Sequence, residues 1–179
     1  MSLTVLSVAY PFAPVGPASV GGSEQILSEL DRSLAAAGHT SIVVASEGSQ
    51  PAGKLIPVPL PQAQALDAAA QSACRARVQQ AIDRALASRP VDLVHLHGLD
   101  FHAYAIPASV PVLVTLHMPI SWYPPDVWTR FPHYRFCCVS DSQQRSCPPT
   151  LANPRVIENG VSIPPNVANL PRGDYALVL

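Results

Sequence analysis

The stretch "LTVLSVAYPFAPVGPASVGGSEQILSEL" (residues 3–30) determines the architecture that we expect for this chain. It begins with a short run of β-branched and aliphatic residues, 3–9, which predicts a buried strand. A turn rich in glycine and proline follows. From Ser23 the apolar positions take up a helical period, with Ser23 as the expected N-cap and Gly38 as the expected stop. A strand, a glycine turn and a helix in this order are typical of a parallel α/β sheet.

The helix predicted from Ser23 is amphipathic. Its apolar residues share one face: Ile26, Leu27, Leu30 and Leu34. Its charged residues lie mostly away from that face: Glu24, Glu29, Asp31 and Arg32. We therefore expect the apolar face to pack on the sheet.

The rest of the chain repeats the alternation of strands and helices. Further strands are predicted at residues 40–46, 54–60, 91–97, 110–117, 134–140 and, as a short one, within 154–161. A long Ala-rich helix is predicted at 62–88, and a short helix fits between the fourth and fifth strands. Prolines place the third strand at a sheet edge. Apolar strands joined by long crossovers predict an α/β fold, a Rossmann-like doubly wound parallel sheet with helices on both faces.

The composition limits the classes of partner. Of 179 residues, 48% are hydrophobic and 13% charged, and the net charge is −1 without any basic run. Nucleic acid is therefore not an expected partner, because binding its phosphates needs clustered cations. The four cysteines form no CxxC pair, which favours reduced thiols in a cytoplasmic protein. No apolar run approaches the length of a transmembrane segment, although peripheral membrane contact stays compatible with the sequence.

Four of the predicted strands end at, or are followed by, a polar residue or a glycine. Gly21 and Gly22 follow the first strand, His97 ends the fourth, His117 ends the fifth and Ser140 ends the sixth. Because ligands bind at the carboxyl ends of strands in such sheets, we expect these residues to form one site.

Gly21 and Gly22 stand at the start of the first helix. The unpaired N–H groups and the dipole at a helix N-terminus attract an anion, so these glycines are candidates for binding the phosphate or sugar of a ligand. Their spacing differs from the dinucleotide-binding fingerprint. The alternative is a turn that needs the positive φ of glycine.

The histidines allow two interpretations. His95 and His97 point to the same face of a strand and could bind a metal, but no third ligand follows at a useful spacing, so no metal site is expected. We expect one imidazole to pack under a helix and His97 to face a cleft. His117 is the stronger candidate for contact with a ligand.

The loop after His117 is aromatic and bent by prolines. Trp122 and Tyr123, with Trp128, could stack on an acceptor ring or could cover the core. Ser140 could line the same site, or its segment could simply start a helix that is capped by Asp141 or Ser142.

Five segments carry a resemblance to a known family. "VGGSEQILSELDRSLAAAGHTSIVVAS", "VDLVHLHG", "PVLVTLHMP", "CVSDSQQRS" and "VIENGVSI" resemble, in order and spacing, the N-terminal domain of retaining family 4 glycosyltransferases with the GT-B fold. The resemblance implies two Rossmann-like domains that face each other across a cleft. Residues 1–165 would form the acceptor-side domain. Residues 166–179 would form a linker and the first strand of a truncated donor-binding domain.

The resemblance also implies an activity. A hexose would pass from a nucleotide diphosphate sugar to a hydroxyl of a small-molecule, glycan or lipid-linked acceptor, with retention and without a metal cofactor. Gly21 and Gly22 resemble the donor-side glycines, His117 the catalytic histidine near the reacting sugar, and His97 a histidine of the cleft rim. Because the family holds the diphosphate with its other domain, the isolated chain is expected to be inactive. The alternatives are a non-catalytic nucleotide- or metabolite-binding module and a GT-B epimerase or phosphorylase.

Overall fold

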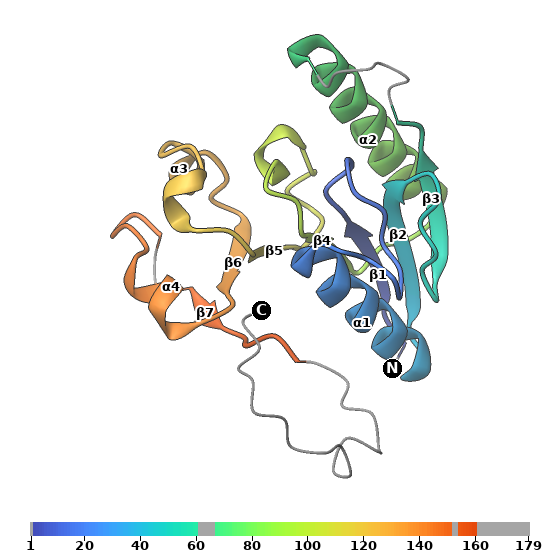
Figure 1. Ribbon diagram of the computed structural model, residues 1–179, viewed down its shortest axis with the longest axis horizontal. Coiled ribbons are helices and arrows are strands. Elements are labelled where there is room, and N and C mark those ends of the chain that lie inside the picture. Colours follow the sequence, from blue (N-terminus) through green and yellow to red (C-terminus); the bar gives the residue numbers. More distant parts are fainter. Residues whose placement is uncertain (1, 61–66, 152–153, 161–179) are drawn as a thin grey trace, which may run out of the picture.

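The computed structural model describes residues 2–60, 67–151 and 154–160, and these form a seven-stranded parallel sheet (Figure 1). The strands are β1 Thr4–Val8, β2 Thr40–Ser46, β3 Lys54–Val58, β4 Leu93–Leu96, β5 Val112–Leu116, β6 Tyr134–Cys138 and β7 Arg155–Val156. Their order is β3-β2-β1-β4-β5-β6-β7, and every neighbouring pair is parallel. The predicted Rossmann-like fold is confirmed, including the position of β3 at an edge.

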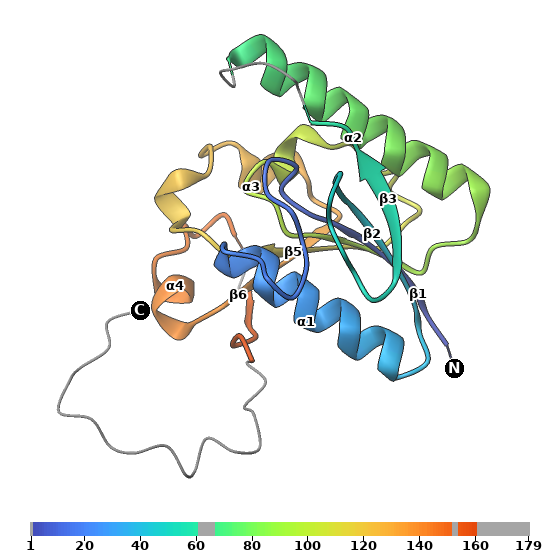
Figure 2. The ribbon, with the colours of Figure 1, turned by 45° about the vertical axis from the view of Figure 1, so that its right-hand side comes forward.

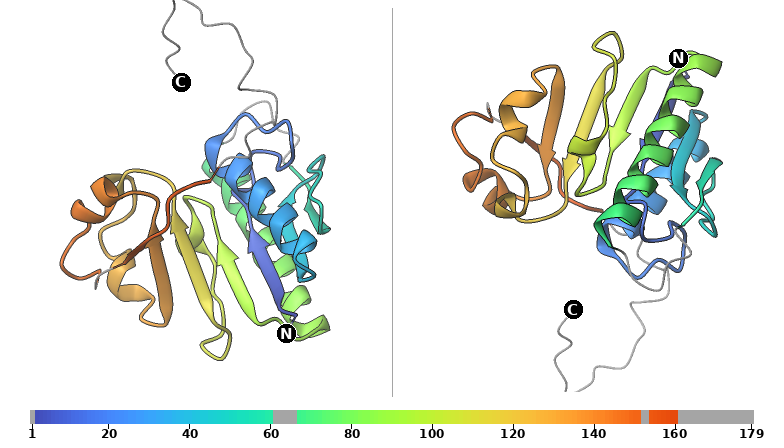
Figure 3. Two further views of the ribbon diagram at one scale, coloured as in Figure 1. Left: turned by 90° about the horizontal axis from the view of Figure 1, so that it is seen from below. Right: turned by 90° about the horizontal axis from the view of Figure 1, so that it is seen from above.

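The helical segments connect these strands. They are α1 Gly22–Ala36, α2 Ala68–Ser88, η1 Phe101–Ala103, η2 Ile120–Trp122, α3 Val127–Arg130 and α4 Asp141–Arg145, where η marks a 3-10 helix. Figure 2 shows α1 and α2 on opposite faces of the sheet. α1 covers the half of the sheet near β1 and β2. Among the described residues, no helix crosses β4 and β5 on the α1 side (Figure 3).

Some boundaries differ from the prediction. The N-cap of α1 is Gly21, which offers no side-chain hydrogen bond, and not Ser23. Gly38 does end this helix and takes a positive φ of 79°. α2 begins after Asp67, whose carboxylate accepts a hydrogen bond from the Ala70 amide, and the first part of the predicted helix lies outside the described residues. Between β4 and β5, the described chain contains the single 3-10 turn η1 in place of a short helix.

The two sides of the sheet differ in chemistry. Aliphatic side chains such as Leu6, Val94 and Val114 are fully buried in the larger core cluster, together with residues of α2. On the α1 side a smaller cluster contains Leu27 and Val43. On the same side of the sheet, β4, β5 and β6 carry the polar side chains of His95, Thr115 and Cys137, which line a cavity beside α1.

Asp31 of α1 is fully buried, contrary to its expected place among the helix residues that point away from the core. Its carboxylate accepts hydrogen bonds from the Ser41 hydroxyl at 2.6 Å, the Ala52 amide at 2.6 Å and the Gly53 amide at 3.2 Å. Glu24 is also buried. Asp31 therefore ties α1 to β2 and to the turn before β3.

Candidate functional site

The strand order brings the predicted site residues to one edge of the sheet. β1, β4, β5 and β6 are consecutive neighbours and all run in the same direction. The segments that contain Gly21, His97, His117 and Ser140 follow the carboxyl ends of these strands. A ligand at this edge can therefore meet all four segments.

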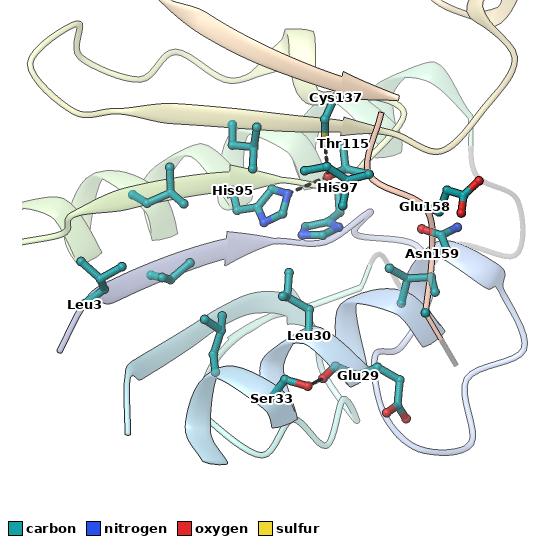
Figure 4. A pocket seen from close by; sticks show the side chains of 17 residues that line it. Leu3, Glu29, Leu30, Ser33, His95, His97, Thr115, Cys137, Glu158 and Asn159 are labelled. Atoms are coloured by element: carbon teal, nitrogen blue, oxygen red, sulfur yellow. Dashed lines mark hydrogen bonds between the residues drawn. The ribbon is translucent and has the colours of Figure 1, made fainter. Parts of the chain in front are cut away.

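Three histidines cluster where β4 and β5 end: His95 lies in β4, and His97 and His117 directly follow β4 and β5. Figure 4 shows His95 and His97. The Nδ1 atom of His97 is 3.1 Å from the Nε2 atom of His117, and their rings stack with centroids 5.4 Å apart. The ring of His95 lies 3.9 Å from that of His97, centroid to centroid. His95 Nε2 also bonds to the Thr115 hydroxyl at 2.7 Å, and this hydroxyl contacts the Cys137 thiol at 3.2 Å. One connected polar network therefore joins β4, β5 and β6.

Burial makes these imidazoles weak bases. Desolvation lowers the pKa of both His95 and His117 to about 4, and the neighbouring His117 lowers that of His95 further. The pKa of His97 is also well below its usual value because this ring is buried, with smaller contributions from the other two rings. All three rings are therefore neutral at physiological pH. Neutral rings can offer a ligand hydrogen bonds but no positive charge.

Two cavities meet at the His97–His117 pair. A cavity of about 560 Å³ lies beside α1, with His95, His97 and Thr115 on its polar side and aliphatic residues of α1 on another (Figure 4). A second cavity of about 520 Å³ lies between the segments that follow β5 and β6. Its lining residues are His117, Met118, Pro119, Ile120, Ser121, Val139, Ser140, Ser142, Gln143 and Ser146.

His97 lies at the wall of a cavity and is almost fully buried. Both His95 and His97 line the cavity beside α1, and His97 is only 3% exposed. His117 is half-buried and lines the second cavity. His117 is thus placed to touch a ligand in the cavity lined by serines, and its ring contacts that of His97.

Gln143 is a site residue that the sequence analysis missed. Its amide nitrogen donates hydrogen bonds to the carbonyl oxygens of Leu116 and Met118, both at 2.8 Å, and its amide oxygen accepts one from the Val139 amide at 2.8 Å. The two carbonyl groups flank His117 in the chain, so Gln143 fixes the backbone on both sides of this histidine.

A signal for Gln143 was present in the sequence. Ser140 is the N-cap of α4 and accepts a hydrogen bond from the Gln143 amide at 3.2 Å, so the expected cap at Asp141 or Ser142 is wrong. Ser followed three residues later by Gln is the pattern of a capping box. This pattern predicts that the glutamine side chain reaches back toward the chain that precedes the helix.

Of the three aromatic candidates, Tyr123 and Trp128 are buried and Trp122 is exposed. Tyr123 is 5% exposed and packs against Phe101 and Trp128, with ring centroids 5.7 Å away in both cases. Its hydroxyl accepts a hydrogen bond from the Met118 amide at 3.2 Å. The Tyr123 ring is therefore part of the core, where it cannot stack on an acceptor. Trp122 is 61% exposed and is free to stack.

Gly21 and Gly22 have conformations that other residues adopt. Gly21 has a φ of −77°, Gly22 is helical, and neither is among the glycines with positive φ. The need for an unusual turn therefore does not account for them. A Cβ atom on Gly22 would meet open space, whereas one on Gly21 would collide with the Glu24 carboxyl group. This carboxyl group lies near the N-terminus of α1, where the helix dipole favours negative charge.

The described residues bear on metal binding and on membrane insertion. Within residues 2–60, 67–151 and 154–160, no group of three or more His, Cys, Asp or Glu side chains is placed to hold a metal ion. In the same part of the chain, every helix is too short or too polar to cross a bilayer.

Comparison with known families agrees with the geometry. The model for Glycosyltransferase Family 4 matches residues 20–163, a span that includes the start of α1, the histidine cluster and α4. Comparison with curated proteins gave no match. The matched span confirms the resemblance inferred from the five sequence segments. The chain therefore belongs to Glycosyltransferase Family 4.

Proposed function

We propose that this chain is the acceptor-side domain of a retaining glycosyltransferase. The enzyme would transfer a hexose from a nucleotide diphosphate sugar to an acceptor hydroxyl, in the cytoplasm and without a metal cofactor. The observation that carries the proposal is the hydrogen-bonded His97–His117 pair at the carboxyl edge of the sheet, beside a cavity lined by serines, in a chain of this family. In this proposal residues 1–165 are the first domain, and residues 166–179 lead into a second.

The neutral state of His117 restricts its part in the reaction. With a pKa of about 4, His117 would orient the sugar or the acceptor by a hydrogen bond. In the proposed same-face reaction, the bond between the anomeric carbon and the phosphate oxygen breaks. The acceptor oxygen bonds to that carbon from the same side, and its proton passes to the leaving phosphate. The protein would contribute position and stabilisation of charge.

The first test uses the isolated chain. If a second domain supplies the contacts to the diphosphate, the purified 179-residue chain should release no nucleoside diphosphate from a panel of nucleotide sugars. The complete reading frame, assayed with the same panel and candidate acceptors, should release it. Sugar transfer by the isolated chain would contradict the proposal that a second domain supplies the contacts to the diphosphate. Inactivity of the complete protein on the whole panel would contradict the proposed activity.

Replacing His117 tests the site itself. In the complete enzyme, His117→Ala should lower kcat by about 100-fold, the usual cost of losing one hydrogen bond to the transition state. The control is His133→Ala, because His133 lies just before β6, at the opposite edge of the sheet. Steady-state rates of diphosphate release measure both variants. Equal rates for His117→Ala and the unchanged enzyme would remove His117 from the site.

Replacing Gly22 tests the proposed donor contact. A Cβ at Gly22 meets no protein atom, and Ala is favoured over Gly in a helix by about 0.5–1 kcal/mol, so Gly22→Ala should leave the fold intact or slightly stabilised. If the α1 amides approach the donor, the same variant should raise the KM for the nucleotide sugar about tenfold, equivalent to about 1.4 kcal/mol. Gly16→Ala, which has ordinary contact with Gln50, is the control. An unchanged KM would show that Gly22 is not close to the donor.

A further inference from the structure

The hydrogen bond between His97 and His117 restricts where the two rings carry their protons. A neutral imidazole has one N–H group and one bare nitrogen. At 3.1 Å, one of the two nitrogens that face each other must donate and the other must accept. Two arrangements satisfy this condition, and each of them fixes the protonation of the outer nitrogens, His97 Nε2 and His117 Nδ1.

The surroundings of His97 Nε2 distinguish the two arrangements. This atom is buried and has no hydrogen-bond partner in the structure. If His117 donated, the proton of His97 would be on Nε2, and a buried N–H group would lack an acceptor. Orphaned buried donors are rarer than acceptors without a partner, because such a donor loses all its hydration without replacement. The arrangement in which His97 Nδ1–H donates to His117 Nε2 is therefore favoured.

We propose that His97 holds His117 in the Nδ1–H tautomer, so that His117 offers an N–H donor to an oxygen atom of the ligand. With Nε2 accepting from His97, Nδ1 is the nitrogen of His117 left to face the cavity that this residue lines. His97 is then a positioning residue. Only the nature of the oxygen, a sugar hydroxyl or a phosphate oxygen, rests on the proposed function.

Neighbouring residues keep both rings in place. His95 stacks on His97 and is itself held by the Thr115 hydroxyl. Gln143 binds the carbonyl groups on both sides of His117 in the chain. The donor nitrogen is therefore fixed both by its ring partner and by its backbone. A base that takes a proton needs a free lone pair, and in this tautomer the outer nitrogen of His117 has none.

Nitrogen NMR tests the proposal on the 179-residue chain. In a sample with ¹⁵N-labelled histidine at pH 7, two-bond hydrogen–nitrogen correlations distinguish protonated from bare ring nitrogens. The expected spectrum has Nδ1 protonated and Nε2 bare in both His97 and His117. A His117 ring protonated at Nε2, or at both nitrogens, would overturn the proposal.

Two substitutions test whether His97 is the cause. In His97→Asn, the side-chain amide nitrogen can donate in place of the Nδ1–H group of His97, so His117 should keep its tautomer. His97→Leu cannot donate, and His117 should shift toward the Nε2–H form that free neutral histidine prefers. The control is His95→Phe, which keeps the stacked ring and should leave His117 unchanged. An unchanged His117 in His97→Leu would exclude the role of His97, and if this variant does not fold, the spectra of the unchanged chain and of His97→Asn still decide.

The spectra also separate this inference from the proposed function. If the expected tautomer is found but the complete protein transfers no sugar, the tautomer proposal stands and the proposed function falls. If the complete protein is a glycosyltransferase but His117 carries its proton on Nε2, the reverse holds. In an active complete enzyme, His97→Asn should retain several times more kcat than His97→Leu at similar KM.

Discussion

Acidification from about pH 7 to about pH 4.5 is expected to lower the free energy of unfolding by roughly 5 kcal/mol. The cause is the buried histidine cluster. His95 and His117 have a pKa of about 4 in the folded chain against 6.5 in the unfolded chain. Over the interval between these values, each such group changes stability by about 1.4 kcal/mol per pH unit. His97, whose pKa is also lowered, adds to the effect.

The sign follows from where the protons bind. Below pH 6.5 the unfolded chain takes up protons on these histidines while the folded chain does not, so the folded state loses stability as the pH falls toward 4. Asp100 works in the opposite direction, because burial raises the pKa of its carboxyl group. Protonation of Asp100 therefore offsets part of the loss at the acid end, but it is one group against the three histidines of the cluster, and burial lowers the pKa of His102 as well.

Urea unfolding at a series of pH values measures the effect. Between pH 6.5 and 4.5, the slope of the free energy of unfolding against pH should correspond to an uptake of about two or more protons on unfolding. In His95→Gln, the slope should correspond to about one proton fewer. Ile82→Val is the matched control, since it removes a buried methyl group on α2 and should lower stability by about 1 kcal/mol at every pH. A stability that stays constant over this interval would mean that the cluster takes up protons without unfolding.

Most of the fold could be predicted because the sheet is parallel and buried. Such strands are covered on both faces, so β2 contains the continuous apolar run 42–45, and the prolines of the β3 segment limit it to an edge. The errors lie at the ends of strands. The predicted fifth and sixth strands include His117 and Ser140, but β5 ends at Leu116 and β6 at Cys138. Apolar pattern alone does not show where a strand leaves the sheet.

The site was predictable in its location but not in its contacts. Because strand ends can be found in the sequence, so can the edge that carries His97 and His117. Their hydrogen bond depends on the register in which Leu96 pairs with Val114, and one sequence does not fix the register of strands 20 residues apart. The same limit applies to Asp31, whose partners include an amide 21 residues away in the chain. Its burial cannot be read from the helical pattern.

Asp31→Ala is expected to lower the free energy of unfolding by about 3–5 kcal/mol. Asp31 is fully buried, and the substitution removes its carboxylate. The Ser41 hydroxyl and the amides of Ala52 and Gly53 then lose their acceptor. Each donor left without a partner costs about 1–3 kcal/mol. Asp31→Asn keeps the shape but turns an NH₂ group toward donors, so it should lose most of the same stability. Ser41→Ala removes one donor with its bond and should cost only about 1 kcal/mol.

Hydrogen exchange distinguishes a local role of Asp31 from a general loss of stability. The turn that contains Ala52 and Gly53 also holds the loop after β1, since the Val15 amide donates to the Ser49 hydroxyl and the Gln50 amide donates to the Val15 carbonyl group. In Asp31→Ala, the exchange rates of the Ala52 and Gly53 amides should therefore rise by more than the loss of global stability alone would cause. The exchange rate of the Gln50 amide should rise in the same way. The amide of Val114, in the middle of β5, should change only with global stability. Unchanged protection at Ala52 and Gly53 would show that the turn is held by its own backbone and not by the buried carboxylate.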